Sequence, residues 1–170
     1  MKLLHIMDSD DYENCTRLSV RHSARAILIS DAKIVMIHSL EYNYYKFPGG
    51  GIERGERKED ALIRETLEET GRHILPDTIE EFGYIHRIRK SLKYDDECFI
   101  QNNYYYFCDA TDEISATKYD ASEQSERFEP VLVDPHIAYE ENAKLSKDDS
   151  HYDMAYRENL ILELLIGRMD

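Results

Sequence analysis

The feature that most restricts the fold of this chain is a glycine turn that runs into an acidic helix, within residues 49–71. Residues 57–70 have the apolar spacing of a helix, and Gly71 follows where helices commonly end. The three glycines at 49–51 interrupt the strand pattern in front of the helix. The fold must therefore bring a tight backbone turn close to the start of a helix.

The predicted helix carries an unusual concentration of negative charge on one side. A helix turns by about 100° per residue, so Glu65, Glu68 and Glu69 fall within an arc of roughly 100°. Each pair of like charges at this spacing costs about 0.2–0.5 kcal/mol. Arg64 lies four residues before Glu68 and offsets part of the repulsion. A divalent cation such as Mg²⁺, which binds carboxylate oxygens, carbonyls, waters and phosphates, would offset more.

The glycines and the rest of the helix fit a ligand site of this kind. Gly49, Gly50 and Gly51 allow positive φ angles and a close approach of the backbone to a ligand, and a carbonyl there could join a metal shell. The start of the nearby helix favours phosphate. On the opposite side of the helix, Ile63 and Leu67 are expected to dock on a sheet. A solvated acidic face remains the alternative for the glutamates alone.

The remaining pattern predicts a mixed α/β protein in one domain, residues 1–170. Strands, helices and loops are expected in the order strands, helix, strands, helices. The expected strands are 17–29, 33–39, 79–90, 98–109 and 130–134, after an acidic and ambiguous segment at 1–16. Besides 57–70, helices are expected at 135–146 and 153–168, and a long polar loop is expected at 110–128.

Charge and composition limit the classes of function. The formal net charge is −14, so the chain should repel the backbone of long nucleic acids, and no nucleic acid polymer is expected as a partner. A small anionic substrate remains compatible with this charge if metal cations neutralise the site locally. Hydrophobic residues make up 42% of the chain and charged residues 33%, which is typical of a folded globular protein.

The cysteines and apolar segments point to the cytoplasm. Cys15, Cys98 and Cys108 are odd in number and match no zinc spacing, so reduced thiols are expected, with Cys98 and Cys108 buried in apolar stretches. The apolar run at the start is too short for a signal peptide, and no segment approaches the roughly 20 apolar residues of a membrane span. The expectation is a cytoplasmic protein that does not enter a membrane.

Residues 50–72 resemble the Nudix box, the signature of the Nudix (MutT-like) hydrolases. The positions that match are Gly50, Glu56, Arg64, Glu65, Glu68, Glu69 and Gly71, all at the spacing of the family. Phe47-Pro48-Gly49 in front of the box also resembles the family's usual lead-in. Two positions depart from it, since the family prefers bulky apolar residues where this chain has Thr66 and Arg72. Neither position is a metal ligand in the family.

The resemblance implies an α/β/α sandwich with a mixed sheet and a Mg²⁺- or Mn²⁺-dependent hydrolase. Such enzymes cleave a pyrophosphate linkage in a nucleoside diphosphate derivative, for example a nucleoside triphosphate or ADP-ribose. The resemblance also implies that Glu65, Glu68, Glu69 and the Gly49 carbonyl bind the metal. Glu56 would support the site through a second metal or a water. Arg64 would orient a carboxylate, and a carboxylate would accept the proton of the attacking water.

The rest of the chain offers candidates for an additional acid and for substrate contacts. Relatives often take a further acid from a distant loop, and here we expect Glu126, or else Glu123. Arg87 could contact phosphate groups, and Tyr45 lies close to the glycines. The candidate substrate-binding residues are Gly50, Gly51, Tyr45 and Arg87.

Three functions remain to be separated, and the sequence favours the first. The first is a Nudix hydrolase, which is favoured because this chain retains every acidic position of the box. The second is a non-catalytic nucleotide-sensing module on the same fold, which the loss of a box carboxylate would favour. A purely structural acidic helix would not need the glycine turn. The amphipathic segment 153–168 leaves open whether it packs on its own sheet or on a second subunit of a homodimer.

Overall fold

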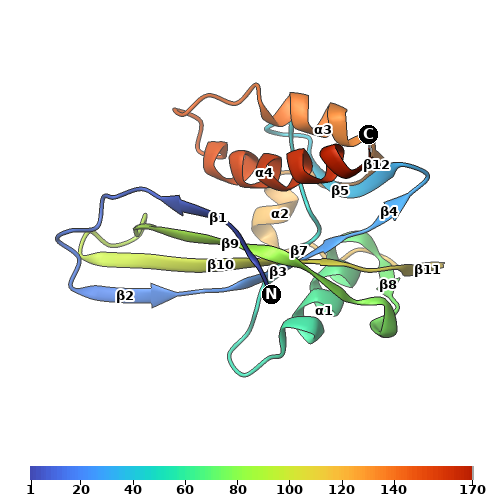
Figure 1. Ribbon diagram of the computed structural model, residues 1–170, viewed down its shortest axis with the longest axis horizontal. Helices are drawn as coiled ribbons and strands as arrows, with labels where there is room; N and C mark the ends of the chain where they lie inside the picture. Colours follow the sequence, from blue (N-terminus) through green and yellow to red (C-terminus); the bar gives the residue numbers. More distant parts are fainter. Residues whose placement is uncertain (170) are drawn as a thin grey trace.

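The computed structural model describes residues 1–169 (Figure 1). Its strands and helices in chain order are β1 (Leu3–Asp8), β2 (Arg17–Val20), β3 (Ser23–Ile27), β4 (Ile29–Ser30), β5 (Lys33–Ser39), β6 (Tyr44–Lys46), β7 (Gly49–Gly51), α1 (Lys58–Thr70), β8 (Arg72–Ile74), η1 (Pro76–Thr78), β9 (Glu80–Lys90), β10 (Glu97–Phe107), β11 (Ala110–Ile114), α2 (Ala121–Ser125), β12 (Phe128–Val133), α3 (Pro135–Asn142) and α4 (Tyr152–Met169).

The central sheet is mixed, as expected. Its strands lie in the order β1-β9-β10-β3-β7, and β2 also pairs with β10. β1 is parallel to β9 and β3 is parallel to β10, whereas β9 and β7 run antiparallel to their partners β10 and β3. A second sheet has the order β12-β5-β4, with β6 on β5. Helix α1 lies on one side and α3 and α4 on the other, so the α/β/α sandwich is confirmed (Figure 1).

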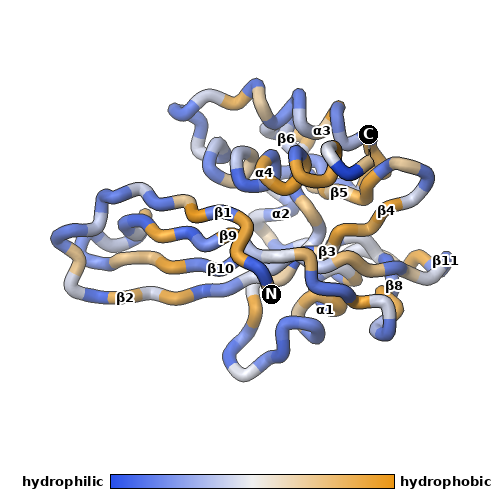
Figure 2. The backbone as a smooth tube through the Cα atoms, in the orientation of Figure 1, coloured by the Kyte–Doolittle hydropathy of each residue, from blue (hydrophilic) through white to orange (hydrophobic). Residues whose placement is uncertain are grey.

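Two apolar layers hold these elements together, and alternation along the strands separates them. Ala24 of β3 and Tyr106 of β10 belong to the cluster that contains Leu62 of α1. Ile27 and Tyr105 belong to the cluster that contains Leu162 of α4. The apolar stretches of β3, β4 and α4 gather in the middle of the molecule, while the loop ends beyond β1, β2, β9 and β10 are hydrophilic (Figure 2).

Helix α1 forms where the spacing predicted it, but the centre of its docked face is different. Gly71 has φ 70° and its N–H donates to the Leu67 carbonyl, which confirms the expected C-terminal cap. The prediction that Ile63 and Leu67 form the docked face holds only in part, since Ile63 packs on the core but both side chains are only partly buried. The docked face is centred on Leu62 and Thr66, which are fully buried.

Two segments differ from the sequence prediction because their secondary structure depends on pairing with strands distant in the chain. The segment 17–29 is divided among β2, β3 and β4, since β10 pairs first with β2 and then with β3. The expected loop at 110–128 contains β11, which pairs with β8, and the short helix α2. Asp120 and Glu123 form a capping box that starts α2, a local signal that the polar composition concealed.

The C-terminal helix packs on the chain's own core. Ile161, Leu162 and Leu165 of α4 are buried in the same cluster as Ile85 of β9 and Phe47. Among residues 1–169, no helix is long and apolar enough to span a membrane. Cys108 is buried as expected, but Cys98 is only partly buried, because β10 extends beyond the apolar layers at that end.

We predict that alanine substitutions at two glycines change the free energy of unfolding in opposite directions. Gly71→Ala should lower the free energy of unfolding by about 2 kcal/mol, because its Cβ would lie 2.0 Å from the Ser115 carbonyl oxygen and φ is positive. The matched control is Gly167→Ala, in exposed helix with nothing within 4 Å of the added Cβ. It should raise stability by about 0.5 kcal/mol. Urea unfolding measures both, and equal stability changes would contradict the role of Gly71.

Candidate active site

The glycine turn is built into strand β7, beside β3. Gly49 pairs with Arg25 and has φ 132°, and a Cβ there would lie 2.1 Å from the Ala24 carbonyl oxygen. Only glycine fits this position. Gly50 and Gly51 do not have positive φ, contrary to expectation. Gly50 is needed for space, because its Cβ would lie 2.3 Å from Oε2 of Glu65.

Arg64 lies at the centre of the acidic face of α1. Its Nε and Nη2 donate to the two carboxylate oxygens of Glu56 at 2.8 and 2.9 Å, and its Nη1 donates to Glu65 at 2.6 Å. Nη2 also donates to the Gly51 carbonyl at 3.1 Å, and Glu68 lies 3.5 Å from Nη1. One guanidinium therefore joins the helix to the glycine turn and offsets the repulsion among three acids.

Burial and Arg64 act in opposite directions on the carboxylates of the box. The hydrogen bonds from Arg64 lower the pKa of Glu56. Burial raises the pKa of Glu65 and outweighs the lowering effect of Arg64, while Glu69 and Glu68 raise it further. Glu68 is more exposed and also lies 3.8 Å from Lys118.

Glu69 occupies a different environment, inside the protein. It is 2% exposed, its Oε1 accepts a hydrogen bond from Lys46 at 2.7 Å, and its Oε2 accepts one from the Gly49 N–H at 2.7 Å. Its backbone carbonyl accepts from the Tyr119 hydroxyl at 2.8 Å. The sequence placed Glu69 correctly on the acidic face but gave no indication that Lys46 would be its partner.

The two loop acids named from the sequence lie in different surroundings. The carboxylate of Glu126 accepts a hydrogen bond from the Tyr44 hydroxyl at 2.5 Å and lies 3.7 Å from His151. Burial raises the pKa of Glu123 to about 7, and the nearby charge of Glu69 contributes to the rise. The structure thus brings Glu123, the second choice from the sequence, under the influence of a box carboxylate.

A buried polar network supports the turn from the α4 side, and sequence reasoning missed it. Arg25 donates to the carbonyls of Phe47 and Gly49 at 2.8 and 3.1 Å. Glu158 of α4 is fully buried and accepts from the Phe47 N–H at 3.0 Å. Arg157 donates to Glu158 at 2.8 Å through Nε. Burial alone would raise the pKa of Glu158, but Arg157 and Arg25 hold it below its ordinary value.

A signal for this network was present in the sequence. Arg25 stands between Ala24 and Ala26 in an otherwise apolar strand, where a charged side chain is out of pattern. Arg157 and Glu158 likewise lie among the apolar positions of α4. Charged residues at apolar positions are almost never buried unless they are paired.

Comparison with known proteins identifies the family. The NUDIX domain family model matches residues 20–154, which is most of the chain. The chain belongs to the Nudix family. This confirms the resemblance and the enzyme class expected from it, a Nudix pyrophosphohydrolase. No curated protein matches the sequence significantly.

Solved structures support the Nudix fold. A NUDIX hydrolase from Nitrosomonas europaea is similar with a TM-score of 0.62 and 16% sequence identity, over 88% of this chain and 90% of that chain. The Escherichia coli ORF135 protein is similar with a TM-score of 0.56 and 20% identity, over 89% of this chain and 94% of that chain. At these identities the likeness concerns the fold alone.

Arg87 and Tyr45, two candidate substrate residues of this Nudix protein, lie away from the box carboxylates. Arg87 of β9 pairs with Asp153 and lines a cavity of about 510 Å³ between β1, β9 and the start of α4. Burial lowers the pKa of Arg87 to about 10, and Arg89 lowers it further. The ring of Tyr45 stacks on His38, with 4.3 Å between centroids.

The donor atoms around the Nudix box suit a hard divalent cation, although they are not gathered around one point. Carboxylate oxygens of Glu56, Glu65 and Glu68 lie beside Arg64, and the carbonyl oxygen of Gly51 lies next to them. Oxygen donors of this kind are those that Mg²⁺ prefers. Within residues 1–169, no three His, Cys, Asp or Glu side chains form a ready-made metal cluster. The cations Arg64 and Lys46 hold the acids in this arrangement.

We predict that Gly50→Ala impairs the Nudix box without unfolding the protein. The new methyl group would displace the Glu65 carboxylate, a flexible group, so turnover should fall by about 100-fold while the melting temperature changes little. Gly49→Ala is the contrasting variant. It meets backbone atoms of β3 and should destabilise the fold by about 3 kcal/mol. A Gly50→Ala protein with unchanged kcat would contradict this assignment.

Proposed function

We propose that this protein hydrolyses a pyrophosphate linkage in a small nucleoside diphosphate derivative, and that it requires Mg²⁺ or Mn²⁺. The observation that carries the proposal is the contact between the acidic face of α1 and the glycine turn. Arg64 joins Glu56 and Glu65 to the Gly51 carbonyl, and Glu69 accepts the Gly49 N–H. Carboxylates and carbonyl oxygens therefore line one patch of backbone that a phosphate chain can approach closely.

The residues of the box have different proposed roles. Glu65, Glu68, Glu69 and the Gly49 carbonyl would hold the metal, and Glu56 would support it directly or through water. When bound, the metal lowers the pKa of a water and neutralises charge on the phosphates. Arg64 fixes the directions of Glu56 and Glu65 by charge-assisted hydrogen bonds. Arg25 fixes the Gly49 carbonyl.

Glu123 is the proposed loop acid, with Glu126 as the alternative. An acceptor for the proton of the attacking water works best when its pKa lies near the operating pH. The side chain of Glu123 is hydrogen-bonded with Glu69 of the box, and burial raises its pKa to about 7. The carboxylate of Glu126 already accepts a hydrogen bond from the Tyr44 hydroxyl. This contact suits a role for Glu126 in holding Tyr44 against the segment before β12.

A second group of proposed substrate contacts surrounds Arg87 of β9, which is separated from the glycine turn of β7 by strands β10 and β3 of the central sheet. Besides Arg87, the cavity is lined by Lys147 and by the rings of Tyr152 and Tyr156, which stack with 5.9 Å between centroids. The carboxylates of Asp8 and Asp153 also line the cavity, and Asp153 pairs with Arg87. Gly50, Gly51 and Tyr45 would contact the part of the substrate nearest the box.

The first test is a panel of nucleoside diphosphate derivatives incubated with and without Mg²⁺ or Mn²⁺. We expect metal-dependent release of phosphate or pyrophosphate from one class of compound, with product masses that locate the cleaved bond. Glu69→Gln should lower turnover by at least about 100-fold while circular dichroism shows an intact fold. Nucleotide-induced thermal stabilisation without turnover would show instead a nucleotide-sensing module.

A second prediction separates the two loop acids. Glu123→Gln should lower kcat by at least about 100-fold, because a neutral amide cannot accept the proton. Glutamine also suits its position in the capping box, so α2 should remain folded. Glu126→Gln is the matched control, since its amide oxygen still accepts from Tyr44, and its kcat should stay close to that of the wild type. The reverse pattern would assign the role to Glu126.

A further inference from the structure

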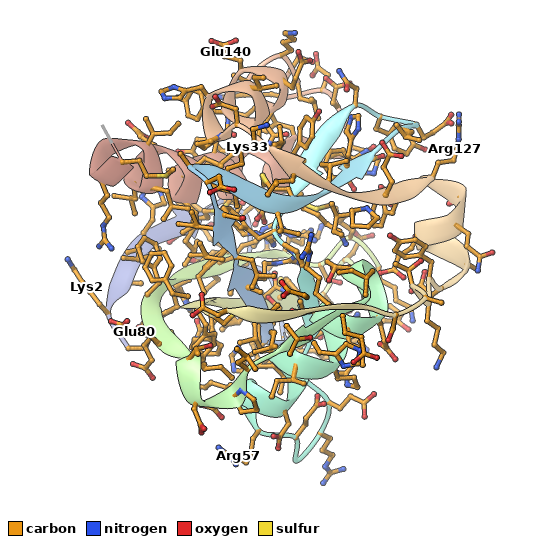
Figure 3. All side chains as sticks on the ribbon, turned by 90° about the vertical axis from the view of Figure 1, so that its right-hand side faces the viewer. Lys2, Lys33, Arg57, Glu80, Arg127 and Glu140 are labelled. Carbon is orange, nitrogen blue, oxygen red and sulfur yellow. The ribbon has the colours of Figure 1, made fainter. Side chains whose placement is uncertain are left out.

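Lys46 is a buried cation whose only hydrogen-bonded acidic partner among the described residues is Glu69. It is the last residue of β6 and is 7% exposed. Its Nζ lies 2.7 Å from Oε1 of Glu69 and 4.2 Å from the centroid of the Phe128 ring. Other charged side chains, such as Lys2, Arg57 and Glu140, point outward at the rim of the molecule (Figure 3). A buried ammonium requires a partner, because unpaired burial of charge is costly.

Both carboxylate oxygens of Glu69 already accept a hydrogen bond in this arrangement. Oε1 accepts from Lys46 and Oε2 accepts from the Gly49 N–H. A divalent cation that binds Oε1 would come within a few ångströms of the Lys46 ammonium. Two positive charges at such a distance in a partly dry site repel strongly. Binding of a metal to Oε1 of Glu69 therefore favours movement of the ammonium away from this oxygen.

We propose that Lys46 is an internal counter-ion that competes with the divalent metal for Glu69 and thereby sets the affinity of the site. The proposal rests on the metal site of the proposed function. Lys46 neutralises Glu69 in the metal-free protein and keeps its carboxylate in place against the Gly49 N–H. When a metal takes Oε1, the ammonium turns away from Glu69 and becomes accessible to solvent and to anionic groups of a substrate. Lys46 is a positioning residue in this sense, since it acts through Glu69.

Besides Glu69, the groups nearest the ammonium are Glu123 and the Phe128 ring. The side chain of Glu123 is hydrogen-bonded with Glu69, and one of its oxygens accepts the N–H of Asp120 in the capping box. The Phe128 ring can hold a cation only weakly compared with a carboxylate. Metal binding therefore has a free-energy cost that arises from the Lys46 charge. Removing this charge should make the metal bind more tightly.

The decisive experiment is a calorimetric titration of the metal-free protein with Mn²⁺ alone. Lys46→Gln keeps a hydrogen-bond donor for Glu69 but removes the charge, and it should bind Mn²⁺ at least about tenfold more tightly than the wild type. Lys46→Arg keeps the charge and should bind like the wild type. In a Glu69→Gln background, Lys46→Gln should have no effect. Wild-type or weaker affinity of a folded Lys46→Gln protein would overturn the proposal.

A measurement on the wild type covers the case in which Lys46→Gln fails to fold. Reductive methylation followed by mass spectrometry reports how accessible each lysine is. Lys46 should be protected in the metal-free protein and should react faster in saturating Mn²⁺, whereas the outward-pointing Lys2 should react equally in both. A rate at Lys46 that Mn²⁺ leaves unchanged would show that the ammonium does not leave Glu69.

These results separate the proposal from the proposed function. Metal-dependent turnover together with equal Mn²⁺ affinities of the wild type and Lys46→Gln would leave the hydrolase standing and overturn the role of Lys46. Tighter Mn²⁺ binding by Lys46→Gln without turnover of any compound in the panel would support the role of Lys46 and contradict the hydrolase. If neither protein binds Mn²⁺, both the role of Lys46 and the metal-dependent hydrolase are overturned.

Discussion

The guanidinium of Arg64 is the interaction on which the site depends. Four acids along one short stretch of chain would repel one another, and Arg64 converts three of them into a fixed arrangement by contacts to Glu56, Glu65 and Glu68. Its bond to the Gly51 carbonyl ties the helix to the turn. Geometry and charge are thus set by one side chain, whose planar fork suits several carboxylates at once.

A second set of charges supports the same turn from the opposite side of the sheet. Arg25 and Arg157 are both almost completely buried, and they share the single carboxylate of Glu158. This network carries more positive than negative charge, in a chain whose net charge is −14. Lys46 and Glu69 add a buried ion pair close by. The buried cations therefore hold the turn from the α4 side, whereas the acids of α1 contact it from the other side.

The sequence predicted those features that depend on local spacing. Helix α1, its end at Gly71, the acidic face and the family all follow from residues 49–72. The missed features depend on partners distant in the chain. Strand β11 exists because it pairs with β8, and Thr66 is fully buried where α1 docks. Nothing near Glu69 in the sequence indicates Lys46, 23 residues earlier, as its partner.

The bond from the Phe47 N–H to Glu158 joins residues 111 positions apart. During synthesis, the segment just before the Nudix box exists long before its partner in α4 does. The loop therefore cannot reach its final geometry on the ribosome until most of α4 has emerged. The geometry of the segment in front of the Nudix box therefore depends on α4 as well as on the residues around it.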